Sequence, residues 1–482
     1  MSRSFKKDLL SGVFYTGIGK YTSLFISLLV TAILARLLSP NDFGIIAIAT
    51  VIMTFFNMIG EIGIAPAIIQ YKNLNSNDIS NIFSLTVYIG LSLSILFYLV
   101  SPYIAAFYES EVLVNILRCL SINLFFVTIN IVPNALFYKE KRFKLISIRT
   151  FLIQFFVGII AVIAALNDFE IYSLLIAPIL SSIILFIVSY RYYPQKFSLK
   201  IKQEPIKRIF SYSSFQFLFN VINYLTRNLD KLLIGKYIDM VSLGYYEKSY
   251  RLMMLPLSNI NSVITPVLHP IFADYQSRKD EMEIQYSKII KVLCYIGIYL
   301  TILLFWGGKE IILITFGEQW MGAVEIFQIL SLTVIIQMIM SPCGSIYQAT
   351  NSTKDMFEFG VISVFTTILG FIVAIIFWRS AIAIAYSFNL SLVVNFFIGY
   401  YIIYHKIFNK SYLKFLFSLR HILIFSCISY IVLYIISQLV VIENILFSFI
   451  FKAITVLILE IIYLKTFNIL DIKDLIIKKI KL

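Results

Sequence analysis

The chain has 482 residues, of which 60% are hydrophobic and only 14% are charged. A soluble protein of this length carries roughly 25% charged residues, so the composition excludes a soluble globular protein. The net charge of +14 does not indicate a nucleic-acid-binding domain, because the basic residues lie in short runs between apolar segments. The composition therefore predicts an all-α integral membrane protein.

About fourteen apolar segments follow one another along the chain, and each can cross a hydrocarbon core of roughly 30 Å as a helix. A helix satisfies its own backbone hydrogen bonds, as a lipid environment requires. The predicted spans are 14–34, 43–69, 82–100, 112–137, 145–166, 172–190, 209–234, 252–272, 289–306, 324–346, 357–378, 381–404, 419–441 and 445–464. The seventh and eighth are the least hydrophobic, so hydropathy alone could give a count of twelve.

The polar connection 194–208 divides the chain and predicts its domains. An N-terminal lobe (1–193) holds spans one to six, and a cytoplasmic linker (194–208) leads to a C-terminal lobe (209–405) with spans seven to twelve. Residues 406–482 contain the last two spans and a basic tail. Lys and Arg gather on one side of the predicted membrane, which places both termini in the cytoplasm.

The residue pattern does not indicate a metal site or a catalytic site. Cys119, Cys294, Cys343 and Cys427 are isolated from one another, and no histidine stands at ligand spacing from them. The predicted external loops are short and cannot build a catalytic domain. We therefore expect no metal, no cofactor and no catalytic residues.

A weak internal repeat relates positions 200 residues apart. Gly44 aligns with Gly244, and Pro66 aligns with Pro266. In the first span the polar residues that share one helix face are Thr16, Lys20, Ser23, Ser27 and Thr31. The same positions 200 residues later hold Gln216, Asn220, Asn223, Arg227 and Lys231.

A polar helix face is tolerated in hydrocarbon where it lines a bundle interior or a water-filled cavity. Duplicated halves around a central site are also the usual architecture of secondary transporters. The repeat therefore predicts that the two leading helices line a shared central cavity. The structural alternative is that these polar residues only hold helices together.

Charges inside the predicted spans are candidate binding residues, because a charge near the bilayer centre costs about 2.5–3.5 kcal/mol or more. The cationic candidates are Lys20, Arg227, Lys231 and Arg251, the last at the predicted entry to span eight. Asp230 is expected to pair with Arg227 or Lys231, which leaves the cavity net positive and suited to phosphate. Glu61 is a candidate for pairing with Lys20 or for ion coupling. The alternative for the cations near span ends is snorkelling to the interface.

Two further charges lie in the last predicted span. Lys452 stands eight positions before Glu460 on the same expected helix. The sequence suggests that Lys452 neutralises Glu460. That role is structural and lies outside the repeated helices.

Two segments resemble bacterial polysaccharide exporters and O-antigen flippases of the multidrug/oligosaccharidyl-lipid/polysaccharide transporter superfamily. Residues 34–44 (LARLLSPNDFG) resemble the first external turn of that family. Residues 227–235 (RNLDKLLIG), with 243–246 (LGYY) and 250–252 (YRL), resemble its seventh and eighth helices. The resemblance covers nearly the whole chain. It implies two pseudo-symmetric six-helix lobes, two additional C-terminal helices, and alternating access by rocking of the lobes.

The implied substrate is an oligosaccharide repeat unit on undecaprenyl pyrophosphate, flipped from the inner to the outer leaflet of the bacterial inner membrane for surface polysaccharide synthesis. The cations named above would bind the diphosphate, with Ser23, Ser27, Asn220 and Asn223 as uncharged polar members of the site. The expected partners are this lipid-linked oligosaccharide and the phospholipid bilayer. A polysaccharide polymerase and glycosyltransferases are further candidates, and no nucleic acid is expected.

Two other functions fit parts of the pattern. A cation-coupled exporter of drugs or metabolites would share the fold, so fold alone does not decide the substrate. A membrane-embedded polysaccharide polymerase or glycosyltransferase would need a general base or metal-binding acids on a sizeable external loop. The short external loops argue against that enzyme.

Overall fold

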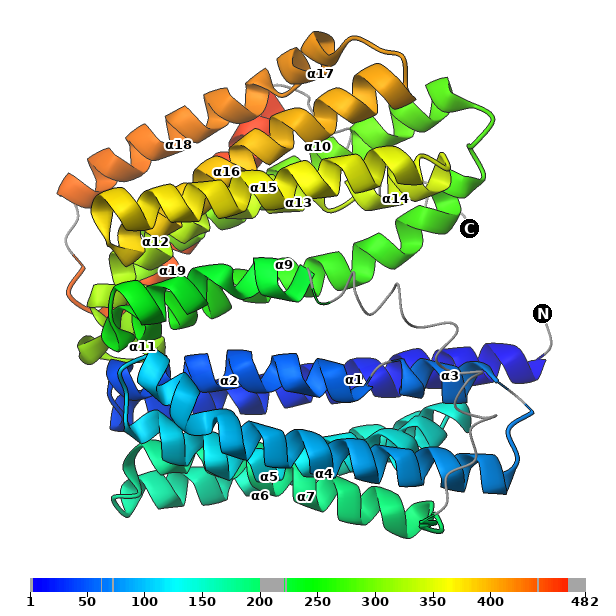
Figure 1. Ribbon diagram of the computed structural model, residues 1–482. Helices are drawn as coiled ribbons and strands as arrows, with labels where there is room; N and C mark the ends of the chain where they lie inside the picture. Colours follow the sequence, from blue (N-terminus) through cyan, green and yellow to red (C-terminus); the bar gives the residue numbers. More distant parts are fainter. Residues whose placement is uncertain are drawn as a thin grey trace. The chain divides into compact units, whose positions relative to one another are not determined.

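The computed structural model describes residues 3–61, 63–71, 73–199, 221, 223–439 and 442–466, and their regular elements are all helices (Figure 1). The predicted site residue Asn220 lies outside these residues. The chain forms two compact units, Met1–Gly244 and Tyr245–Leu482. The predicted division at the linker 194–208 stays a prediction, because most of that linker is outside the described part.

The first unit is built from long helices joined by short turns. Its elements are α1 (Arg3–Leu37), α2 (Pro40–Glu61), α3 (Ile64–Gln70), α4 (Ser76–Phe107), α5 (Val112–Lys139), α6 (Phe143–Leu166), the 3-10 turn η1 (Glu170–Tyr172), α7 (Ser173–Tyr192), and helical residues 223–237. The helix α9 (Met240–Ala273) begins in this unit and continues into the second. We call residues 223–237 the 223–237 helix.

The second unit continues with helices of more variable length. They are α10 (Lys279–Trp306), α11 (Gly308–Thr315), η2 (Glu318–Trp320), α12 (Gly322–Ser331), α13 (Thr333–Met340), α14 (Cys343–Ala349), α15 (Thr353–Trp378), α16 (Ala381–Tyr401), the π-helical η3 (Ile402–Ile407), α17 (Tyr412–Ser418), α18 (Arg420–Leu439) and α19 (Ile445–Thr466).

Within the described residues, 12 helical segments are long and apolar enough to cross a membrane. They correspond to predicted spans one to six and nine to fourteen. The predicted seventh span begins outside the described part, and α9, at the eighth, does not meet the criterion of apolar length. The lower hydropathy of these two spans was expected, and the count of fourteen stays a prediction.

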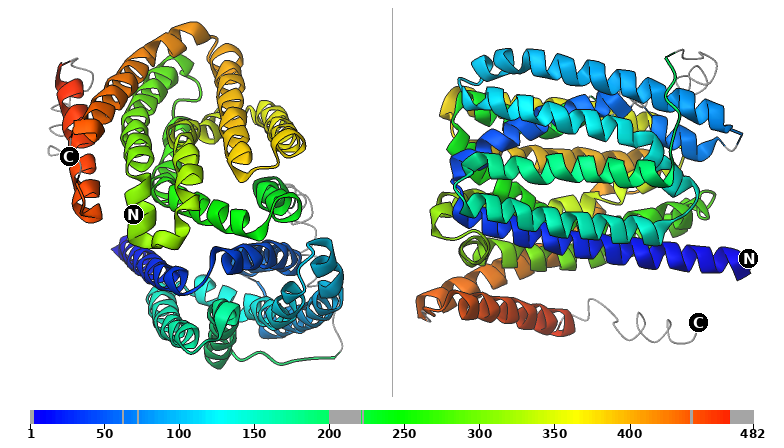
Figure 2. Two further views of the ribbon diagram at one scale, coloured as in Figure 1. Left: turned by 90° about the vertical axis from the view of Figure 1, so that its left-hand side faces the viewer. Right: turned by 90° about the horizontal axis from the view of Figure 1, so that it is seen from below.

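Small side chains allow close helix approach in the first unit, where α4, α5, α6 and α7 run side by side (Figure 2). A Cβ added to Gly158 of α6 would lie 2.6 Å from Val30 of α1, and one added to Gly19 of α1 would lie 2.6 Å from Ser147 of α6. Such contacts are what drive helix association in lipid, because apolar burial gives little net gain there.

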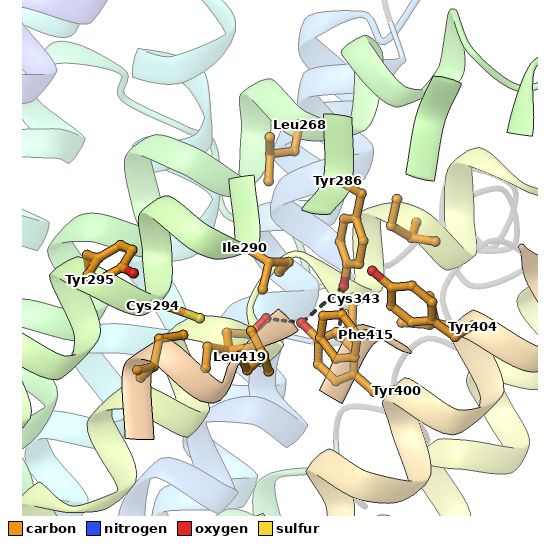
Figure 3. Close-up of a cluster of buried hydrophobic side chains, with 14 of the residues drawn as sticks. Leu268, Tyr286, Ile290, Cys294, Tyr295, Cys343, Tyr400, Tyr404, Phe415 and Leu419 are labelled. Carbon is orange, nitrogen blue, oxygen red and sulfur yellow. Dashed lines mark hydrogen bonds between the residues drawn. The ribbon is translucent and has the colours of Figure 1, made fainter. Parts of the chain in front are cut away.

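An aromatic and polar cluster forms part of the core of the second unit (Figure 3). Tyr286 of α10 lies within hydrogen-bond distance of Tyr400 of α16 (3.2 Å) and of the Cys343 thiol (3.5 Å). Phe415 of α17 stacks on Tyr400 and Tyr404, with ring centroids 4.7 and 4.3 Å apart. The short helix α17 is therefore fixed to the long helices by its one buried ring.

A buried ion pair attaches the last helix to the second unit. Lys452 Nζ of α19 lies 2.6 Å from Glu310 Oε1 of α11 and donates to the Trp306 carbonyl at 2.8 Å. Ser448 also donates to Glu310 at 2.8 Å. The expectation that Lys452 neutralises Glu460 was wrong, because Lys452 pairs with Glu310 of α11 instead.

Removing one partner of this pair should destabilise the protein more than removing both. Lys452→Met leaves the buried Glu310 carboxylate unpaired, and breaking such a pair costs about 3–5 kcal/mol. The double variant Lys452→Met, Glu310→Gln should recover much of that loss. Thermal unfolding of the purified variants in detergent measures both effects. Additive losses in the double variant would contradict a stabilising pair.

Candidate functional site

The two helix pairs of the internal repeat have matching ends. In the first pair α1 ends at Leu37 and α2 begins at Pro40, while in the second the 223–237 helix is followed by α9 from Met240. The element boundaries are thus 200 residues apart, as the sequence repeat predicts. This confirms the repeat at the level of local structure.

The two turns are capped by the same pair of side chains with their order exchanged. In the first turn the Ser39 hydroxyl donates to Asp42 Oδ2 at 2.7 Å. In the second turn Ser242 donates to Asp239 Oδ2 at 2.8 Å. Both arrangements satisfy free backbone N–H groups at a helix start, where Ser and Asp are favoured.

Two glycines let the first turns of α2 and α9 touch each other. A Cβ on Gly44 would lie 1.8 Å from the Met240 carbonyl oxygen, and a Cβ on Gly244 would lie 2.0 Å from the Pro40 carbonyl oxygen. Each glycine therefore lies on the first residue of the other helix. Only glycine permits backbone atoms to approach this closely. We call this contact the glycine crossing.

The 223–237 helix packs along α2 at residues that follow the glycine crossing on α2. The Tyr224 hydroxyl donates to the Val51 carbonyl at 2.8 Å, and Gly235 lies against Ile48. Partners earlier on α2 meet residues later on the 223–237 helix, so the two helices run antiparallel. The 223–237 helix is thereby held against α2 in the first unit.

A salt bridge also holds the 223–237 helix. Lys236 Nζ lies 2.8 Å from Glu109 Oε1, in the turn between α4 and α5, and 5.0 Å from the centre of the Phe107 ring. The hydrogen bond and charge of Lys236 hold the pKa of Glu109 below its usual value of 4.5. The carboxylate therefore stays ionised at neutral pH and holds the turn to the 223–237 helix.

The predicted cations lie at different depths from these turns. At 1.5 Å per helical residue, Lys20 is about 25 Å along α1 from its end at Leu37, and Arg227 is about 15 Å from the end of the 223–237 helix. Both residues are exposed. With the turns at the edge of a hydrocarbon layer roughly 30 Å thick, these distances would place Arg227 near the middle and Lys20 near the opposite side.

Asp230 is buried, at 2% exposure, and accepts a hydrogen bond from the Lys231 backbone N–H at 2.8 Å. Lys231 is half-buried. No salt bridge of the described residues joins Arg227 to Asp230. Arg227 is therefore an exposed guanidinium that no carboxylate of the described residues pairs.

The uncharged members of the predicted site are not equivalent. Ser23 lies four residues after Gly19, on the side that α1 turns to α6, and its Oγ is buried with no hydrogen-bond partner. Ser27 and Asn223 are half-buried. Asn223 directly precedes Tyr224, whose hydroxyl is bonded to α2. The role of all three in contacting sugar stays a prediction.

Glu61 and Arg251 have local surroundings that the sequence did not predict. Glu61 is the last residue of α2, exposed, just before Gly63 with φ 71°, so it stands at a helix break instead of within a continuous span. Arg251 is exposed, about 16 Å into α9, which begins twelve residues before the predicted eighth span. Its place at the entry to that span stays a prediction.

Arg149 is a cation whose setting could not be predicted from sequence. It is buried in the first unit, where its guanidinium donates to Ser189 Oγ at 2.7 Å and Asn134 Oδ1 at 2.8 Å and lies over Phe137. Uncharged acceptors from two other helices thus hold it. The contacts are those of a structural cation, and no signal in its own segment identifies them.

The chain matches known proteins over most of its length. Residues 33–325 match the family described as polysaccharide biosynthesis protein. An uncharacterized membrane protein in the cps region of Klebsiella pneumoniae is 24% identical over 401 residues, 81% of each chain. The teichuronic acid biosynthesis protein TuaB of Bacillus subtilis (strain 168) is 27% identical over 400 residues, 82% of each chain.

The fold also matches a solved structure. The lipid II flippase MurJ in an inward closed conformation superposes with a TM-score of 0.75 at 16% identity, over 96% of this chain and 99% of that one. At this identity the likeness establishes the fold and not the substrate.

Alanine at either glycine of the glycine crossing should destabilise the protein, because its Cβ would overlap a backbone carbonyl oxygen. We expect Gly44→Ala and Gly244→Ala each to cost about 1–3 kcal/mol of unfolding free energy, as overpacking does. Gly17→Ala is the matched control, since a Cβ there meets nothing within 4 Å. Thermal unfolding in detergent provides the comparison. Equal midpoints for all three variants would argue against the close crossing.

The salt bridge to Glu109 should make stability depend on pH in one direction. The folded pKa of Glu109 is depressed, so its contribution is present above the usual pKa of 4.5 and is lost as pH falls through the lowered value. Glu109→Gln should therefore lower the unfolding temperature at neutral pH, and the difference from the wild type should shrink in acid. A difference that does not change with pH would exclude the salt bridge as its cause.

Proposed function

The chain belongs to the polysaccharide biosynthesis protein family, and from that premise we propose that it flips an undecaprenyl-pyrophosphate-linked oligosaccharide across the bacterial inner membrane. Its family and fold are those of membrane transporters, so the chain is a multi-pass transporter and not an enzyme. The proposed direction is from the inner to the outer leaflet, with both termini in the cytoplasm. The relative TuaB is named for the biosynthesis of teichuronic acid, and this name supports a role of the chain in the synthesis of a polysaccharide.

One observation carries the proposal: Arg227 is exposed on the 223–237 helix, three residues after Tyr224, whose hydroxyl contacts α2, and about 15 Å from the end of that helix. A charge at that depth is costly unless a ligand or water compensates it. The planar guanidinium donates in pairs to phosphate oxygens, so a diphosphate suits it better than a neutral sugar or a cationic drug does.

The other proposed binding residues are also cations on helices. Lys20 is exposed nearer the side away from the turns, and Arg251 is exposed about 16 Å into α9. Lys231 is half-buried beside Asp230. We propose that these side chains bind the diphosphate, while the prenyl chain remains in lipid and Ser27, Asn223 and Asn220 contact sugar hydroxyls.

Alternating access is the proposed mechanism. Binding of the diphosphate would favour one arrangement of the helices and release would favour the other, since a ligand shifts a conformational equilibrium only through its different affinities for the two states. The glycine crossing and the Lys236 to Glu109 salt bridge would have to separate when the pathway opens at the end where the turns lie.

Transport in cells tests the proposal directly. A strain that lacks the gene should accumulate lipid-linked oligosaccharide on the inner leaflet, and the wild-type chain should clear it. Arg227→Ala and Lys20→Ala should each reduce export about tenfold or more, since loss of one charged hydrogen bond is worth about 1.5–3 kcal/mol. Arg227→Lys should recover part of the activity.

The matched control is Arg142→Ala, which removes a cation that is paired with Glu140 outside the spans, at 2.9 Å. It should export like the wild type at equal membrane abundance. Normal export by both the Arg227→Ala and Lys20→Ala variants would overturn the assigned binding residues. Export of cationic dyes without clearance of the lipid-linked oligosaccharide would overturn the proposed substrate.

A further inference from the structure

A cationic pocket lies in the second unit, and none of the proposed substrate-binding residues lines it. Its volume is about 570 Å³, and it is formed by α10, α17 and α18. Lys291, Lys414, Arg420 and His421 line it, together with Leu413 and Phe417. No carboxylate of the described residues is among its lining side chains.

The basic side chains of the pocket lie where charged sequence gives way to apolar sequence. Lys291 is the last charged residue of α10, because 292–306 holds no Asp, Glu, Lys or Arg. Arg420 is the first residue of α18, which carries no further acid, Lys or Arg to its end at Leu439. Two helices thus place their last or first charge at this pocket, which is the level expected of a membrane surface.

The short helix α17 has the form of an interfacial helix. Phe415 is buried at 5% exposure and stacks on Tyr400 and Tyr404, while Leu413 and Phe417 are 74% and 65% exposed. Exposed apolar side chains beside basic ones are the pattern of helices that lie in the boundary between headgroups and acyl chains. Because Phe415 fixes α17 in place, the pocket does not need the lipid to order it.

Three cations of this pocket differ from neighbouring lysines, because no carboxylate of the described residues pairs them. In the part of the chain that the structure describes, Lys291, Lys414 and Arg420 form no salt bridge. The nearby Lys406 and Lys410 lie 3.2 and 2.6 Å from Asp355 and Asp280. The Arg420 guanidinium instead lies 4.2 Å from the centre of the Phe417 ring. Uncompensated cations at a membrane surface attract anionic headgroups.

We propose that this pocket binds the phosphate headgroup of an anionic phospholipid, with Leu413 and Phe417 against its acyl chains. In the orientation proposed above, the lipid comes from the cytoplasmic leaflet. Bound there, it would anchor α17 and the start of α18 at the membrane surface. This site is separate from the residues proposed to bind the transported diphosphate, so either assignment can fail without the other.

Lipid retention by the purified full chain tests the proposal. Native mass spectrometry would count phosphatidylglycerol molecules retained after release from mixed phosphatidylglycerol and phosphatidylcholine vesicles. Lys291→Gln, Lys414→Gln, Arg420→Gln together should retain phosphatidylglycerol on the order of a hundredfold less well, since each cation near the surface is worth about 1 kcal/mol. Phosphatidylcholine retention should not change.

The matched control removes three cations that already have acidic partners. This control variant, Lys354→Gln, Lys406→Gln, Lys410→Gln, loses the same total charge as the pocket variant. It should retain phosphatidylglycerol like the wild type. If the pocket variant does not fold, Arg420→Gln alone should weaken retention about fivefold. Equal retention by wild type, pocket variant and Arg420→Gln would overturn the site. Displacement of the lipid by millimolar glycerol phosphate would overturn its assignment to a lipid.

Discussion

The constraint on which this molecule depends is the cost of placing charge in a hydrocarbon layer. A cation in a spanning helix must be paired, must reach polar atoms of neighbouring helices, or must meet a ligand or water. Lys452 is satisfied by Glu310, and Arg149 by two neutral acceptors. Within the residues that the structure describes, Arg227 has neither arrangement. This difference in local surroundings, and not the presence of charge, distinguishes Arg227 from Lys452 and Arg149.

Much of the fold could be predicted because hydropathy and turn chemistry are local. Long apolar runs specify helices, and the turns at 37–40 and 237–240 could be aligned from Gly44, Gly244 and their neighbours alone. Side-chain partners could not be predicted in the same way. Lys452 and Glu310 are far apart in sequence, and nothing in the last span indicates that its lysine meets α11. The candidate cations were correctly placed on helices, but their depth depends on where each helix begins, which hydropathy blurs when its first turns are charged.

The glycine crossing explains why the repeat is retained where the rest of the two halves has diverged. Close backbone contact needs glycine on both helices, and each glycine lies on the first residue of the other helix. The contact is therefore self-complementary in the manner of an isologous interface. A substitution on one helix cannot be relieved by a larger space on the other, because the atoms in contact are backbone. The capping residues are less constrained, since Ser and Asp exchange positions between the two turns without loss of either hydrogen bond.

The proposed binding cations lie at different distances along their helices, and this suggests how a diphosphate could cross the membrane. A single tight site would hold a doubly charged group too strongly to release it, and a pathway without cations would not admit it. Lys20 and Arg227 are about 25 and 15 Å along their helices from the turns, so a diphosphate could exchange one donor for another as it travels. Each contact then needs to be worth only a few kcal/mol, which is the range of a charge-assisted hydrogen bond.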